Sequence, residues 1–166
     1  MNPPVRQLIR RPDYLLAFGF GSGLVPRAPG TAGSLLGLVL FLPLLALPVV
    51  VQVAVILVAL LLGIWICDRV AAELALKDPG GIVWDEFVGM WITMLLLPDW
   101  RWLPVAFLLF RLFDIAKPWP VSWADRQLTG GLGIMLDDVI AGLYALLALQ
   151  GLAWLVGHLA ESAGVL

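Results

Sequence analysis

Two pairs of adjacent carboxylates stand beside apolar segments of this chain, and their types and spacing are suited to chemistry. Asp85 and Glu86 lie within IVWDEFVGMW, and Asp137 and Asp138 lie within IMLDDVI. Charged groups are costly in apolar surroundings unless they are paired, hydrated or bound to a metal. Carboxylates held at one depth could bind a hard divalent cation such as Mg²⁺. Alternatively, the doublets are helix N-terminal acids stabilised by the macrodipole, or a solvated boundary.

A second block, FRLFDIAKP, contains three charged residues set among apolar ones. Arg111, Asp114 and Lys117 are spaced i, i+3 and i+6, which places them along one side of a helix that Pro118 would end. Two interpretations stay open. The first is an intrahelical charge ladder. The second is a phosphate clamp, in which the two cations bind phosphoryl oxygens and Asp114 orients them or joins a metal shell.

The glycine-rich segment APGTAGS precedes the first apolar run. Thr31 and Ser34 are predicted N-cap residues, and backbone N–H groups at a helix start can bind phosphate. The spacing is not that of a Walker loop, because no Gly-Lys-Ser/Thr follows. A flexible entry loop is the alternative.

Composition decides the class of protein in which these residues must work. Of 166 residues, 61% are hydrophobic and only 13% are charged, against roughly 25% charged in soluble domains. The chain is therefore expected to be an integral membrane protein, and no dense basic patch suggests nucleic acid. Cys67, the only cysteine, excludes an intrachain disulfide and is expected to be a small buried hydrophobe. No secretory signal peptide is expected.

The apolar segments predict an all-α, polytopic membrane protein with short transmembrane hairpins and interfacial helices. Pro43 and Pro48 predict a turn between the first two helices. A single span over 87–110 would bury Asp99 and Arg101 near its centre, so a hairpin is preferred. The expected membrane helices are 32–46, 49–67, 87–97, 102–113 and 138–157.

With the N-terminus inside, this topology places every Lys and Arg except Arg101 on the cytoplasmic side, which agrees with the positive-inside rule. The Gly-rich run, Asp78, both doublets and FRLFDIAKP then share one face. His158 falls on the opposite face, so a histidine-based phosphatase is not expected. Carboxylates, a metal and cations remain, a set suited to activating water against a phosphate ester. Three tryptophans are expected at headgroup depth: Trp84, Trp119 and Trp123.

Four segments, in this order, resemble the phosphatidylglycerophosphatase A family: GFGSGLVPRAPGTAGS, DPGGIVWDEFVGMWIT, FRLFDIAKPWPVSWADR and GGLGIMLDDVIAGLYA. The resemblance extends from about residue 18 to residue 145 of one domain, 1–166. An N-terminal arm, 1–17, and a tail, 158–166, lie outside it.

The resemblance implies an all-helical, multi-pass enzyme of the bacterial inner membrane with its active site on the cytoplasmic face. It would hydrolyse phosphatidylglycerophosphate to phosphatidylglycerol and phosphate with Mg²⁺. The family motif positions in this chain are Thr31, Asp78, Asp85, Glu86, Arg111, Asp114, Lys117, Asp137 and Asp138.

Roles for these residues are hypotheses. The expected metal ligands are Asp85, Glu86, Asp137 and Asp138, with Asp78 as an additional candidate. The expected phosphate-binding residues are Thr31, Ser34, Arg111 and Lys117. Arg111 and Lys117 would also stabilise developing charge, and either Asp114 or Asp138 would take a proton from water.

Two other functions fit parts of the pattern. A cation-coupled small membrane transporter would need carboxylates near the bilayer midplane, whereas these lie at segment ends. Another Mg²⁺-dependent lipid headgroup enzyme, such as a CDP-alcohol phosphotransferase, would carry a motif beginning Asp-Gly-x-x-Ala-Arg, which this chain lacks.

Overall fold

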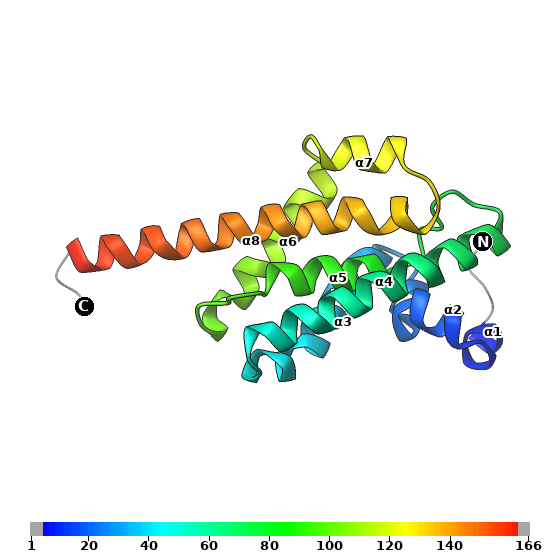
Figure 1. The fold of residues 1–166 in the computed structure, drawn as a ribbon, viewed down its shortest axis with the longest axis horizontal. Coiled ribbons are helices and arrows are strands. Elements are labelled where there is room, and N and C mark those ends of the chain that lie inside the picture. Colours follow the sequence, from blue (N-terminus) through cyan, green and yellow to red (C-terminus); the bar gives the residue numbers. More distant parts are fainter. Residues whose placement is uncertain (1–4, 163–166) are drawn as a thin grey trace.

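Helix α8, Gly130–Ser162, is the axis of the fold, and α4, α5, α6 and α7 pack against it (Figure 1). The arrangement is that of a computed structural model, which describes residues 5–162; the last residues of the predicted tail, 163–166, and the first of the arm, 1–4, lie outside that range. The described residues form helices and no strand, so the all-α prediction is confirmed. The other α-helices are α1 (Val5–Arg10), α2 (Pro12–Ala17), α3 (Pro29–Phe41), α4 (Val49–Leu74), α5 (Trp84–Thr93), α6 (Leu103–Ala116) and α7 (Val121–Gln127).

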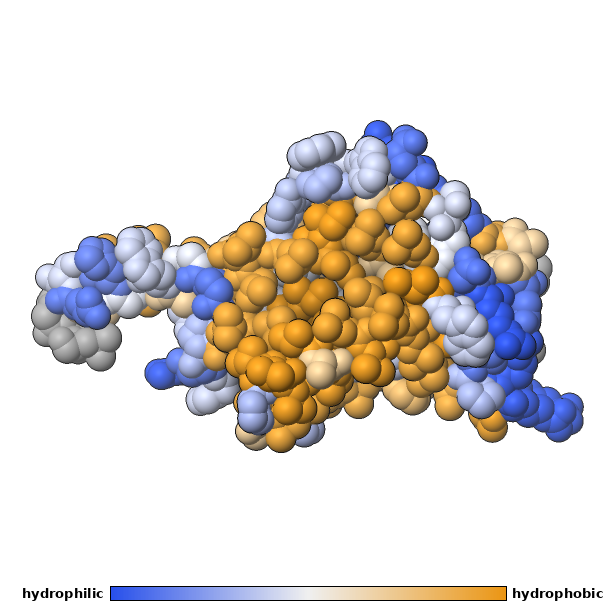
Figure 2. Space-filling model, viewed as in Figure 1, coloured by the Kyte–Doolittle hydropathy of each residue, from blue (hydrophilic) through white to orange (hydrophobic). Residues whose placement is uncertain are grey.

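Three stretches are long and apolar enough to cross a bilayer. They are Pro29–Ala46, which joins α3 to the 3₁₀ helix η2 (Leu42–Ala46), and the helices α4 and α8. On the face shown in Figure 2, a broad apolar belt crosses the middle of the molecule, with hydrophilic residues gathered toward its ends. Val50 and Leu147 are among the most exposed apolar side chains of this belt. Soluble monomers rarely expose a continuous surface of this kind, so the belt indicates a membrane setting.

Helices α5 and α6 form the predicted hairpin. They are joined through the 3₁₀ turn η3, Trp100–Trp102, where Asp99 Oδ1 accepts a hydrogen bond from the backbone N–H of Arg101 at 2.7 Å. A continuous span is therefore excluded, and both charges lie at a turn. The helices run over 84–93 and 103–116 in place of the expected 87–97 and 102–113, and with 10 and 14 residues each is shorter than a full span.

Helix α5 is buried on nearly every side, between α3 and α8. Two indoles fasten it: Trp91 Nε1 donates to the Gly37 carbonyl at 2.8 Å, and Trp84 Nε1 donates to the Ala59 carbonyl at 2.9 Å. A buried indole needs such a partner for its N–H. The interfacial prediction for Trp84 is therefore wrong. Trp119, just before α7, and Trp123, within α7, are exposed.

The contact between α5 and α8 depends on two glycines. A Cβ on Gly142 would collide with the carbonyl of Gly89, and a Cβ on Gly89 would collide with the Phe110 ring and approach the Asp138 carbonyl. The two backbones can approach closely only because neither position carries a side chain. This approach sets Asp138 of α8 beside α5, which carries Glu86.

Several helix ends differ from the predictions. Helix α3 begins at Pro29 with Ala28 as its N-cap, so Thr31 and Ser34 lie inside the helix and their N-cap prediction is wrong. Proline is favoured at the first helical position because its missing N–H has no partner there anyway. Helix α4 continues from the expected 67 to Leu74, and α8 begins at Gly130 instead of 138 and continues through Ser162. The turn predicted between Pro43 and Pro48 does separate η2 from α4.

Candidate active site

The first turns of α3 and α5, the first third of α8 and the last turns of α6 come together. The end of the molecule beyond them is formed by α1, α2 and the end of α4 (Figure 1). The four meeting segments bring together residues that lie far apart in the sequence: Ser34 and Arg111, which are in contact, are separated by 77 positions. We call this group the acidic site; it consists of Asp85, Glu86, Asp114, Asp137 and Asp138 with Arg111 and Lys117. The predicted convergence of both doublets, the FRLFDIAKP block and Ser34 is therefore observed in three dimensions.

Arg111 occupies the middle of the acidic site. Its Nη1 lies 2.6 Å from Glu86 Oε2, 2.7 Å from Asp114 Oδ2 and 3.2 Å from Ser34 Oγ. The side chains of Arg111, Glu86 and Asp114 are all less than 15% exposed. The predicted i, i+3 pair of Arg111 and Asp114 is therefore present, and Arg111 also reaches α5. One guanidinium links two carboxylates that would otherwise repel each other.

The first turns of α3 lie directly against Glu86. Ser34 Oγ lies 2.6 Å from Glu86 Oε2 and 2.8 Å from the Gly30 carbonyl, and the Ser34 side chain is buried. A Cβ on Gly30 would overlap Glu86 Oε1 and crowd Arg111 Nη1. The glycine in APGTAGS thus allows a close helix-to-carboxylate approach. Thr31 lies half-buried in the same helix, and its phosphate-binding role stays a prediction.

Lys117 departs from the predicted ladder. It takes a left-handed conformation (φ 42°) just after α6, and its Nζ turns to Asp125 Oδ1 at 2.6 Å and Asp137 Oδ2 at 2.8 Å. Partial burial opposes its charge, but the hydrogen bonds to Asp125 and Asp137 raise its pKa above the usual lysine value. Lys117 therefore stays a cation. Asp125 was missed as a site residue, although its WADR segment belongs to a quoted motif.

Three carboxylates are close enough to share one cation. Oxygen atoms of Glu86, Asp114 and Asp138 all lie within 4.8 Å of one another. The predicted set of Asp85, Glu86, Asp137 and Asp138 shares only two members with this group. Adjacent residues on a helix point about 100° apart at 3.6 residues per turn, so both members of a doublet cannot face one point. One member of each doublet joins Asp114, for which the sequence supports a place in the metal shell only as an alternative.

The remaining acids lie around this group. Asp137 pairs with Lys117, while half-buried Asp85 has a buried Oδ1 with no hydrogen-bond partner in the described chain. Asp78 lies in the loop after α4, where it lines a cavity of about 20 Å³, the size of one water, together with Asp125 and Asp137. Lys77 borders the same cavity. The acids thus extend from a buried core to an open rim.

Two buried polar atoms at the site lack a partner within residues 5–162. They are Asp85 Oδ1 and Arg111 Nε. A buried donor or acceptor without a hydrogen bond is costly, so native proteins seldom keep one without a ligand or water to satisfy it. One orphan is an acceptor suited to a cation or a proton donor, and the other is a donor suited to a phosphoryl oxygen. The site thus offers complementary groups to a metal-bound phosphate.

Two other residues considered from the sequence lie apart from the site. Cys67 is fully buried in the apolar core, as predicted. His158 is exposed near the end of α8, where its ring stacks on Trp154 with centroids 5.5 Å apart. At 1.5 Å per residue, it lies about 30 Å along α8 from Asp137. A histidine nucleophile is thereby excluded for the acidic site.

Long apolar helices with a carboxylate-rich centre toward one end define an all-helical membrane protein with a candidate hydrolytic site. The comparisons specify its family. Residues 15–153 match the family model described as Phosphatidylglycerophosphatase A. The chain belongs to this family, and it is an enzyme of the phosphatase class.

The relatives agree over nearly the whole chain. Phosphatidylglycerophosphatase A of Escherichia coli (strain K12) is 42% identical over 92% of this chain and 88% of its own. Phosphatidylglycerophosphatase A of Haemophilus influenzae is 46% identical over 88% of this chain and 92% of its own. A Bacteroides thetaiotaomicron protein, provisionally named a phosphatidylinositol-3-phosphatase, is 38% identical over 90% of this chain and 100% of its own. No solved structure matches the chain significantly.

Proposed function

We propose that this protein hydrolyses the terminal phosphate of phosphatidylglycerophosphate to give phosphatidylglycerol and inorganic phosphate, with Mg²⁺ as cofactor. The observation that carries the proposal is the group Glu86, Asp114 and Asp138 beside Arg111, toward one end of an apolar helical bundle. A lipid phosphomonoester needs this combination, because its chains stay in the bilayer while its phosphate meets charged groups at headgroup depth.

Mg²⁺ fits the donor set. It prefers oxygen ligands in octahedral geometry and keeps several waters beside one or two carboxylates. Glu86, Asp114 and Asp138 would hold it, and the unpartnered Asp85 Oδ1 offers a further acceptor for a bound water. When bound, the ion supplies positive charge to phosphoryl oxygens and lowers the pKa of a water molecule.

The cations of the chain would orient the phosphate. Arg111 Nε has no partner within residues 5–162, while Nη1 is held by Glu86 and Asp114, so its planar fork is fixed before substrate arrives. Lys117 remains charged and would neutralise a second phosphoryl oxygen as negative charge develops. Both groups would be preorganised by their carboxylate partners, so little reorientation is needed during the reaction.

The chemical step transfers the phosphoryl group to water. The water oxygen forms a bond to phosphorus as the bond from phosphorus to the glycerol oxygen breaks. Asp114 or Asp138 accepts a proton from the water, and this same proton then passes to the departing glycerol oxygen to complete phosphatidylglycerol. Asp114 is the more accessible of the two, while Asp138 is almost completely buried.

We further propose a multi-pass arrangement in the bacterial inner membrane, with the acidic site facing the cytoplasm. The distribution of basic residues supports this orientation, because Arg101 alone belongs to the turn between α5 and α6 at the other ends of these helices. A transporter is less well supported, since Asp85 and Glu86 lie in the first turn of α5 and Asp114 lies in the last turn of α6.

The decisive experiment is a phosphate-release assay with the purified protein. Phosphatidylglycerophosphate should be hydrolysed with Mg²⁺, and hydrolysis should stop with a chelator and return when Mg²⁺ is restored. Phosphatidylinositol 3-phosphate and a water-soluble phosphomonoester serve as comparison substrates, and we expect both to react more slowly. Faster hydrolysis of phosphatidylinositol 3-phosphate would replace the proposed substrate.

A variant tests the residues that hold the metal. Asp138→Asn keeps the size of the side chain but removes its charge, so phosphate release should fall on the order of 100-fold. Near-full activity of a folded Asp138→Asn protein would remove Asp138 from the metal site.

A further inference from the structure

A second groove lies outside the acidic site, where the N-terminal arm meets α4. It has a volume of about 490 Å³, and its wall combines charged with apolar side chains. The charged members are Arg10, Arg11, Asp13, Arg69 and Glu73; the apolar members include Leu16, Leu62, Trp65 and Ile66. Nothing in the proposed reaction uses these residues.

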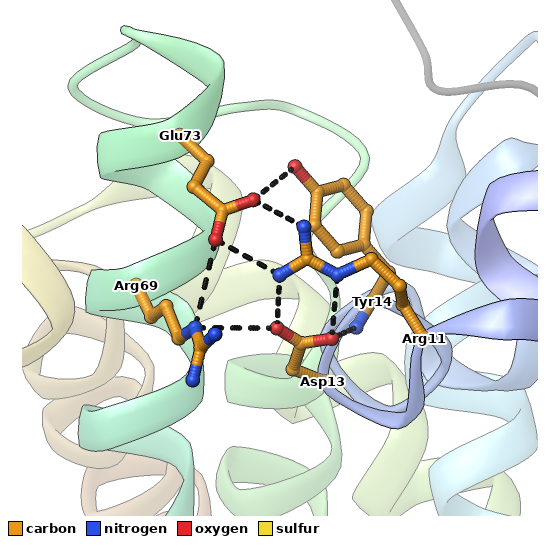
Figure 3. Close-up of polar contacts among 5 residues, drawn as sticks. All are labelled: Arg11, Asp13, Tyr14, Arg69 and Glu73. Atoms are coloured by element: carbon orange, nitrogen blue, oxygen red, sulfur yellow. Dashed lines mark hydrogen bonds and ion pairs between the residues drawn. The ribbon is translucent and has the colours of Figure 1, made fainter.

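One wall of this groove is a polar network that fastens the arm to α4 (Figure 3). We call it the arm network; it consists of Arg11, Asp13, Tyr14, Arg69 and Glu73. Arg11 donates hydrogen bonds to both carboxylates, at 2.6 Å to Asp13 Oδ2 and at 2.8 Å to Glu73 Oε1, and its guanidinium lies 4.6 Å from the centre of the Tyr14 ring. Arg11 is therefore committed to holding α2 against α4.

The other two arginines of the groove have donors to spare. Arg69 contacts the carboxylates only through Nε, at 3.5 Å, and its side chain is 53% exposed (Figure 3). Its guanidinium lies 5.9 Å from the Trp65 ring. Arg10 is exposed and makes no ion pair with the described residues. Three arginines thus face two carboxylates, which leaves this end of the groove with an excess positive charge.

A second, apolar groove lies next to the charged one along α4. Leu62 lines both the charged groove and a neighbouring one of about 400 Å³. The walls of the second groove are entirely aliphatic or aromatic and include Val55, Leu62 and Trp84. From Arg69 to Val55, α4 advances about 21 Å, somewhat more than half of a hydrocarbon core of about 30 Å. This is the depth that an acyl chain reaches from a headgroup.

The opposite end of α4 has a groove of a different character. Its volume is about 620 Å³, and Asp99 is the only charged residue that lines it. Asp99 is itself paired with Arg101 at 3.2 Å. Two large grooves therefore flank one apolar helix, and among the described residues only the one beside the arm offers arginines with donors to spare. An anionic ligand is favoured at that end alone.

We propose that the groove between the arm and α4 binds one anionic phospholipid of the bilayer. Its phosphate lies between Arg10 and Arg69, and one acyl chain follows α4 past Leu62 toward Val55. Arginine suits this task because its planar guanidinium presents several donors to phosphate and stacks on an aromatic ring, here Trp65. The site is separate from the acidic site and does not depend on the reaction proposed for it.

Trp65 gives a local readout of this binding. The full-length protein is placed in nanodiscs of phosphatidylcholine with increasing fractions of phosphatidylglycerol whose acyl chains carry bromine, a fluorescence quencher. The chain has 8 tryptophans, so the Trp65 signal is the difference between the wild type and Trp65→Phe. We expect brominated phosphatidylglycerol to quench this signal at lower mole fractions than brominated phosphatidylcholine, and added salt to reduce the preference.

The variant Arg10→Gln/Arg69→Gln tests the headgroup contact. A basic residue near an anionic surface contributes about 1 kcal/mol, so the half-quenching fraction of phosphatidylglycerol should rise roughly 5-fold for each arginine removed. Half-quenching by phosphatidylcholine should not change. Arg11 keeps its bonds to Asp13 and Glu73 in this variant, so the arm should stay on α4, which a thermal unfolding scan verifies.

Arg101→Gln is the matched control, because it removes the same charge beside the groove at the far end of α4. It should leave the Trp65 signal unchanged. Equal quenching by the two lipids would overturn the proposal, and so would an equal shift in Arg101→Gln, which would indicate general charge attraction. The readout needs no turnover, so it succeeds or fails independently of phosphate release.

Discussion

The acidic site and the arm network are both built around a glutamate paired with an arginine, but their surroundings differ. In the acidic site, Glu86 and Arg111 are 11% and 14% exposed, and Arg111 leaves a buried nitrogen unbonded. In the arm network, Glu73 and Arg11 are 37% and 32% exposed, and Arg11 bonds carboxylates on both sides. The first pair is confined and incompletely satisfied; the second is accessible and saturated.

This difference separates a binding site from a structural contact. Five carboxylates face two cations in the acidic site, an imbalance that folding alone does not explain because buried, unpaired charge is destabilising. Two carboxylates face two arginines in the arm network, so it is locally neutral. A cationic ligand requires such an excess of negative charge, held in place by neighbouring side chains. The hydrogen bonds of Arg11 in the arm network need no ligand and serve to hold the arm, whereas Arg69 keeps donors to spare for the proposed lipid.

The same substitution in both clusters should give the largest contrast. Glu86→Gln removes a buried charge that contacts Arg111 and Ser34, so phosphate release should fall on the order of 100-fold. Glu73→Gln removes an exposed charge of the arm network and should change the rate by no more than about twofold. Comparable losses in both variants would falsify the distinction between the two clusters.

Gly30→Ala should disturb the acidic site through geometry alone. The added methyl group would overlap Glu86 Oε1, so the carboxylate must move, and a displacement of about 1 Å can reduce a rate roughly 100-fold. Gly151→Ala is the control, because a Cβ there meets no atom within 4 Å. The kcat of both variants is measured at saturating Mg²⁺. An unchanged rate in Gly30→Ala would mean that Glu86 need not be held against α3.

Arg11→Gln should act on stability and leave catalysis nearly intact. It breaks the bonds that connect Asp13 to Glu73, so Tm in detergent should fall by a few degrees while kcat stays within about twofold. Arg6→Gln, an exposed position in α1, is the control and should not move Tm. A large loss of activity at an unchanged Tm would instead connect the arm network to the chemistry.

The smallest effect concerns pH. The hydrogen bond from Arg11 holds the pKa of Asp13 below its usual value, despite partial burial. The contribution of Asp13 to stability is thus fully present above the unfolded pKa of about 3.9 and is lost as pH falls through the lower native value. The Tm of the wild type should exceed that of Asp13→Asn at pH 6, and the gap should narrow below pH 4. A gap independent of pH would contradict the ionic character of the network.

Much of the fold followed from local pattern. The apolar runs predicted the order of the helices, and charge placement correctly favoured a hairpin at Asp99 and Arg101 over one long span. Helix ends were less accurate, since α3 starts at Pro29 and α8 at Gly130. Trp84 was misplaced because sequence does not reveal that its N–H has a carbonyl partner on α4.

The acidic residues themselves were also identified from sequence, because carboxylates are rare and costly beside apolar segments. Their grouping was not. Neighbouring residues on a helix point about 100° apart, so the two members of each doublet face different neighbours. Glu86 and Asp138 lie near Asp114, while Asp137 pairs with Lys117. Asp125 and the contact of Gly30 with Glu86 were not foreseen, because both depend on a neighbour distant in the chain.

The sequence by itself therefore determined the membrane class, the helical architecture, the family and the set of charged residues available for chemistry. These properties depend on composition and on spacing within single segments. Only the tertiary structure decided which carboxylates lie close enough to share one cation. It also decided which arginine has its donors engaged by carboxylates and which has donors to spare. Those outcomes depend on the close approach of α5 to α8 and of the arm to α4, and such distances are set by packing between segments far apart in the chain.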